Sequence, residues 1–175
     1  MLILGIDPGI ARVGWGFVHV DRSTHTAQEY GCFETKAGLP PEIRIQQIHQ
    51  FLTEIIQKEK PTIIALEQVF FAANTTTALS VSQARGAIML TASQANVPIA
   101  SYTPLQVKQT ITGYGRADKN QVQQMIKTLL KLPTIPKPDD TADALAIALT
   151  HAYSFKMANY SLASKTGSNV KYPRR

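Results

Sequence analysis

LILGIDPG (residues 2–9) and TIIALE (residues 62–67) are two apolar runs, and each leads into an acidic residue. The first stops at Asp7, where Pro8 and Gly9 signal a turn. The second is continuous and has the length of a buried strand. A right-handed crossover would lay this strand parallel to the first. We therefore expect Asp7 and Glu67 to lie side by side at the carboxyl ends of neighbouring strands, where open α/β sheets bind ligands.

The remaining periodicity predicts an α/β domain with a central five-stranded mixed sheet, three antiparallel strands plus two parallel, flanked by helices. Short connections make the first three strands antiparallel neighbours. The other predicted strands are Val13–Val20, Glu29–Thr35 and Ile99–Tyr102. The predicted helices are Pro41–Lys58, about Thr77–Ala95, one from Pro104 to the break at Gly113, one capped by Asp118, and one from Asp139 or Asp140 to about Phe155.

The length of 175 residues suits one domain. We expect residues 1–155 to form that single domain and residues 156–175 to be a polar, basic, disordered tail. The single cysteine, Cys32, excludes an internal disulfide. The sequence shows no signal peptide and no apolar run of the roughly 20 residues that a membrane span needs. We therefore expect a cytoplasmic protein with no membrane partner.

Positive charge is concentrated in the middle of the chain, whose formal net charge is +6. Residues 68–137 hold seven Lys and Arg residues, Arg85 and Arg116 among them, but Asp118 is their only acid. A segregated basic segment is typical of a protein that binds a polyanion such as DNA. A solvated basic face with no partner remains the alternative.

Four acidic residues form the candidate catalytic and metal site: Asp7, Glu67, Asp140 and Asp143. Taken singly, each has a structural explanation as a turn, strand-end or first-turn helix residue. If the last helix begins over the edge that holds Asp7 and Glu67, however, four carboxylates converge and cannot all stay ionised without cations. Oxygen ligands of this kind favour Mg²⁺ or Mn²⁺. Two such ions can stabilise the attacking and leaving oxygens of a phosphodiester.

Five segments taken together resemble the RuvC family of Holliday-junction resolvases. They are GIDPG (5–9), ALEQVF (65–70), SQARG (82–86), VKQTITG (107–113) and TLLKLP (128–133) followed by DDTADALAIALTH (139–151). The resemblance covers roughly residues 1–152. It implies a ribonuclease H-like fold, a homodimer, and dependence on two Mg²⁺ ions for which Mn²⁺ can substitute. It also implies paired symmetric nicks in four-way junction DNA and cooperation with the RuvA–RuvB branch-migration complex. Water attack assisted by two metal ions would leave 5′-phosphate and 3′-hydroxyl ends.

Matched motif by motif, the family's four catalytic acids fall on Asp7, Glu67, Asp140 and Asp143. The aromatic residue that probes the junction falls on Phe70. The lysines that contact DNA fall on Lys108 and Lys119, to which the basic segment adds Arg116 and Arg85 as DNA-binding candidates.

Three questions stay open at this point. Asp139 competes with Asp140 for the third acid position, because both spacings to Asp143 share a helix face. The helix Thr77–Ala95 is rich in small residues, which suits a dimer interface, its own sheet, or both. A junction-binding protein without catalysis, or a relative that cuts RNA or other structured DNA, is the alternative function.

Overall fold

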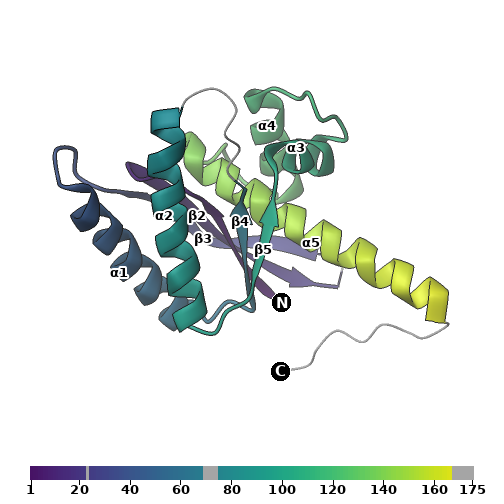
Figure 1. Cartoon of the computed structure of the whole chain (residues 1–175). Coiled ribbons are helices and arrows are strands. Elements are labelled where there is room, and N and C mark those ends of the chain that lie inside the picture. Colours follow the sequence, from purple (N-terminus) through teal and green to yellow (C-terminus); the bar gives the residue numbers. More distant parts are fainter. Residues whose placement is uncertain (23, 69–74, 167–175) are drawn as a thin grey trace.

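In the computed structural model, the strands of the described residues form one five-stranded sheet with helices on both faces (Figure 1). It describes residues 1–22, 24–68 and 75–166, with only the backbone course described for 75–77 and 158–166. The spatial order β3-β2-β1-β4-β5 has antiparallel pairs among the first three strands and parallel pairs of β4 with β1 and β5. The predicted mixed sheet is therefore confirmed. The strands are β1 Leu2–Asp7, β2 Arg12–Asp21, β3 Thr24–Glu34, β4 Ile63–Glu67 and β5 Ile99–Tyr102.

The helices are α1 Pro41–Glu59, α2 Thr75–Gln94, α3 Pro104–Thr112, α4 Lys119–Leu129 and α5 Asp139–Thr166. The cap predicted at Asp118 is confirmed, and helices α3 and α4 both begin with complete capping boxes. The side chain of Thr103 accepts from the backbone N–H of Gln106, and that of Asp118 accepts from the backbone N–H of Gln121. Each cap satisfies backbone N–H groups that the first turn leaves unpaired.

Two predicted boundaries were wrong. Strand β3 begins at Thr24 rather than Glu29, because pairing with β2 continues down to the turn, where Asp21 lies opposite Thr24. Helix α5 runs to Thr166, so the disordered tail predicted from residue 156 is wrong for residues 156–166. No proline or glycine interrupts that stretch. The rest of the predicted tail lies outside the described residues.

Strand alternation sends the two faces of the sheet into two separate apolar cores. Helices α1 and α2 pack on one face against Leu2, Leu4 and Ile6 of β1. Helix α5, with α3 and α4 beside it, covers the other face, where Ile3 contributes to the core (Figure 1). Because side chains alternate along a strand, the odd-numbered Asp7 points to the α5 face.

Helix α5 lies unusually close to the sheet because glycines stand beneath it. A Cβ added to Gly5 would lie 2.0 Å from the backbone oxygen of Ala144, and one added to Gly14 would lie 2.0 Å from that of Asp140. Only glycine leaves room for the helix backbone at these positions. The start of α5 therefore rests directly on β2, next to the end of β1.

Among the residues that the structure describes, no helix is both long enough and apolar enough to cross a membrane.

Candidate active site

A single row of residues crosses the sheet at the carboxyl end of β1. Gly14 lies opposite both Asp7 and Cys32, and Glu67 lies opposite Tyr102. Asp7 and Glu67 directly follow the paired residues Ile6 and Leu66 of parallel β1 and β4. Residues of one row share a face of the sheet. The prediction that Asp7 and Glu67 are neighbours is therefore confirmed, and both point toward α5.

Helix α5 brings the other two acids to this row. Its first turn sits on Gly14, and Asp140 and Asp143 are three residues apart, which places them on one helix face. Burial raises the pKa of Asp7 to about 8, with further contributions from the carboxylates of Glu67, Asp143 and Asp140. The structure thus brings the other three predicted acids within electrostatic reach of Asp7.

Asp7, Glu67 and Asp143 cannot easily all be ionised at once, because the pKa of each is raised. Burial, and then Asp143, raise the pKa of Glu67, although a hydrogen bond with the side chain of Asp7 opposes the shift. A hydrogen bond between two carboxyl groups needs a shared proton, and the raised pKa of Asp7 supplies it near neutral pH. Burial also raises the pKa of Asp143, against the opposing effect of Lys119.

Lys119 supplies the positive charge nearest to these acids. Its Nζ lies 3.0 Å from Oδ2 of Asp143 and 3.6 Å from Oδ2 of Asp139. Burial disfavours its charged form, but hydrogen bonding to Asp143 and the charges of Asp143 and Asp139 outweigh this and raise the pKa of Lys119. As the side chains stand, no three Asp, Glu, His or Cys residues of the described chain enclose a place for a metal ion.

The two adjacent acids at the start of α5 face different partners. Asp139 accepts a hydrogen bond from Nζ of Lys137 at 2.9 Å, and its pKa is lowered by Lys137 and then by Gln123 of α4. Asp140 instead lies against β2, with its backbone over Gly14 and Oδ2 at 3.9 Å from Nη1 of Arg12. The carboxylate of Asp140, rather than that of Asp139, therefore contributes to the raised pKa of Asp7.

Residues 3–151 match the family model described as crossover junction endodeoxyribonuclease RuvC. The chain belongs to this RuvC family. It is 50% identical to the crossover junction endodeoxyribonuclease RuvC of Pelotomaculum thermopropionicum over 155 residues, 89% of this chain and 94% of that protein. It is 51% identical to the protein of the same description from Brevibacillus brevis over 152 residues, 87% and 92% of the two chains.

Solved structures agree with this family membership. Thermus thermophilus RuvC in complex with Holliday junction substrate has a TM-score of 0.86 at 37% identity, covering 90% of this chain and 96% of that one. The yeast mitochondrial Holliday junction resolvase shares the fold, with a TM-score of 0.66 at 18% identity over 95% and 84% of the chains. The resemblance recognised in the sequence, and the ribonuclease H-like fold it implied, are confirmed.

The DNA-binding candidates of this RuvC-family chain lie at different distances from the acids. Lys108 and Lys119 line a cavity of about 230 Å³ together with Glu67 and Asp143. Arg85 donates through Nε to the backbone oxygen of Glu67 at 3.3 Å and through Nη2 to Oγ of Ser101 at 3.1 Å. Arg116 is exposed in the segment between α3 and α4. Phe70 lies outside the described residues.

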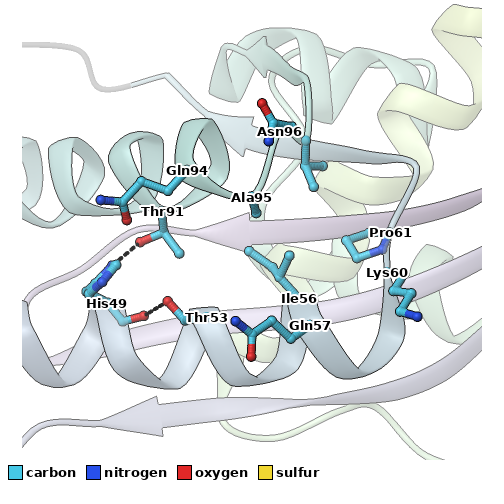
Figure 2. A pocket seen from close by; sticks show the side chains of 11 residues that line it. His49, Thr53, Ile56, Gln57, Lys60, Pro61, Thr91, Gln94, Ala95 and Asn96 are labelled. Atoms are coloured by element: carbon cyan, nitrogen blue, oxygen red, sulfur yellow. Dashed lines mark hydrogen bonds between the residues drawn. The ribbon is translucent and has the colours of Figure 1, made fainter.

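The larger cavity, about 630 Å³, lies elsewhere, between the C-terminal halves of α1 and α2 (Figure 2). There Nδ1 of His49 is 2.8 Å from Oγ1 of Thr91, and the hydroxyl of Thr53 donates to the backbone oxygen of His49 (Figure 2). None of the residues that line it is acidic. Cavity size alone therefore does not distinguish the candidate site of this RuvC-family protein, which we locate by its gathered carboxylates.

Sequence reasoning missed two supports of the site. The first is the pair Gly5 and Gly14, against which the backbone of α5 packs. The signal in the sequence was a glycine in the interior of each of two strands. The second is Tyr102, whose Oη lies 2.7 Å from Nδ1 of His151 and links the end of β5 to α5. His151 is buried, and burial lowers its pKa, so it serves as an internal partner of Tyr102.

Proposed function

We propose that this protein is a divalent-metal-dependent endonuclease that resolves four-way DNA junctions by paired, symmetric cuts. One observation carries the proposal. Four carboxylates from β1, β4 and α5 gather at one end of the sheet, and burial and mutual repulsion raise the pKa of Asp7 to about 8. Such a group has too much negative charge to be ionised without a cation. Membership of the RuvC family supplies the substrate class.

The donor set fits a hard divalent cation. Asp7, Glu67, Asp140 and Asp143 offer only carboxylate oxygens, which favour Mg²⁺ or Mn²⁺, and we propose that they hold two such ions. When bound, these ions would activate the attacking water and stabilise the leaving 3′ oxygen. Strand pairing of β1 and β4 positions Asp7 and Glu67. Close packing of α5 on Gly5 and Gly14 positions Asp140 and Asp143.

The basic residues would bring the DNA to the acids. Lys108 of α3 and Lys119 of α4 stand on the wall of the cavity that Glu67 and Asp143 also line, so both can reach a backbone phosphate there. Arg116 and Arg85 would extend this positive surface, and Phe70 is proposed to probe the junction. The long-range attraction of basic residues offsets the repulsion that the acids alone would exert on DNA.

We further propose that two copies act together through α2. Its side chains Leu79, Met89 and Leu90 are 62%, 42% and 57% exposed, and an exposed apolar surface of this kind can serve as a contact between protein copies. A two-fold dimer would present two identical sites to a junction of similar symmetry, so matched cuts would follow. Cooperation with RuvA–RuvB and a cytoplasmic location remain predictions from the family.

A cleavage assay tests the proposal. The protein is incubated with Mg²⁺ and a labelled four-way junction, a linear duplex or an RNA–DNA hybrid. We expect paired nicks in the junction alone, and we expect Asp7→Asn to bind the junction without cutting it. Asp21→Asn, an exposed acid at the far end of β2, is the matched control and should cut normally. If the wild-type protein binds the junction but cuts nothing with Mg²⁺ or Mn²⁺, the passive junction-binding protein is the correct function.

A further inference from the structure

Lys119 holds a position in which one ammonium group touches two acids of α5. Its Nζ is 3.0 Å from Asp143 and 3.6 Å from Asp139. These two acids are four residues apart, one helix turn, so their carboxylates lie on the same side of α5. The ammonium therefore lies within ion-pair distance of both at once, and a small rotation of its long side chain can favour either.

We propose that Lys119 and a metal ion compete for Asp143, and that Asp139 receives the ammonium when the metal binds. This inference rests on the proposed metal site and adds a role for two residues near it. An ammonium and a divalent cation on the same carboxylate would repel each other at close range. One must leave before the other can settle. The ammonium acts as a counter-charge that keeps the acids together in the metal-free protein.

Asp139 is built to hold this charge and not the metal. Its side chain is 43% exposed, and one oxygen is already bonded to Nζ of Lys137 at 2.9 Å. Gln123 of α4 also bonds it, so it is held toward α4 and away from the buried row. The other oxygen is the one that faces Lys119. Asp139 is thus a positioning residue, which acts through Lys119.

The backbone of Lys119 has no need to move in this exchange. Lys119 is the first residue of α4, directly after Asp118, whose capping box with Gln121 fixes the helix start through two hydrogen bonds of 2.9 Å. Only the flexible four-carbon side chain must turn, and lysine pairs as a point charge without the fixed geometry that arginine requires.

Direct Mn²⁺ titration of the DNA-free protein, with free Mn²⁺ followed by electron paramagnetic resonance, tests the exchange. Lys119→Met removes the half-exposed ion pair with Asp143 that would compete with the metal, and it should tighten Mn²⁺ binding about three- to tenfold. Asp139→Asn should weaken binding by about threefold, because the ammonium then has only Asp143 as a partner. Lys137→Met is the matched control. It removes the other lysine that pairs with Asp139, leaves the contact of Lys119 with Asp143 in place, and should change the affinity for Mn²⁺ less than about twofold.

The double variant separates this exchange from simple charge effects. If Asp139 acts through Lys119, then Asp139→Asn has no measurable effect in the Lys119→Met background. If the two single effects simply add, or if Lys119→Met binds Mn²⁺ as the wild type does, the inference is wrong while the nuclease proposal stands. If no variant binds Mn²⁺ at millimolar concentration and the wild type cuts nothing, both fail. In a Mn²⁺-soaked crystal, Lys119 should contact Asp139 alone; a retained contact with Asp143 would overturn the exchange.

Discussion

Replacing Gly14 with alanine perturbs the proposed catalytic site without removing any charged group. The new Cβ would lie 2.0 Å from the backbone oxygen of Asp140, whereas ordinary contact begins near 3.4 Å. The start of α5 must therefore move by about 1.4 Å, and it carries Asp140 and Asp143 with it. Displacement of about 1 Å in a catalytic group can cost about a hundredfold in rate. We therefore expect Gly14→Ala to cut a four-way junction about a hundredfold more slowly.

Rate, binding and stability should respond differently to this change. Overpacking should destabilise the fold by about 1–3 kcal/mol. Junction affinity should hold, because Lys108 and Lys119 lie on α3 and α4. The assay is single-turnover cleavage of a labelled junction in Mg²⁺, with binding measured separately and folding checked by circular dichroism. Gly31→Ala is the control: the atoms nearest to its Cβ would be in the side-chain ring of Trp15, the closest at 3.3 Å. If the Gly14→Ala protein folds and cuts the junction at the wild-type rate, close packing of α5 on the sheet does not position the proposed catalytic acids.

Two further predictions concern stability. The pKa of Asp7 is raised from 3.8 to about 8, so the folded protein retains a proton that the unfolded chain releases above about pH 4. In EDTA the wild type should therefore lose stability as the pH rises from about 4 to about 8, and Asp7→Asn should melt higher than the wild type at pH 8 by differential scanning fluorimetry. A lower melting temperature for Asp7→Asn there would contradict the charge repulsion. Tyr102→Phe removes the hydrogen bond to buried His151 and should lower the free energy of unfolding, measured in urea, by about 1–3 kcal/mol. Tyr30→Phe, whose side chain is exposed, serves as the control. Equal stability of the two variants would rule out a structural role for the hydrogen bond between Tyr102 and His151.

Local pattern was enough to predict most of the framework. Apolar runs and turn residues marked the strands, and the period of three and four marked the helices. The positions of Asp7 and Glu67 followed from one chirality rule, because a right-handed crossover between two buried runs makes them parallel. The edge strand β3 was predicted too short, since its partly polar start at Thr24 is decided by pairing with β2 and not by its own apolar pattern.

The sequence by itself thus determined which acids end which strands, that Asp140 and Asp143 share a helix face, and where the basic segment lies. These properties depend on residues close together in the chain or on the fixed periods of helix and strand. Only the tertiary structure decided that Asp140 rather than Asp139 acts on Asp7, and that Lys119 rests between Asp139 and Asp143. Both depend on how closely α5 packs onto Gly5 and Gly14 and on where α4 docks beside it. Such docking is a sum of contacts between segments far apart in the chain, and no local spacing encodes it.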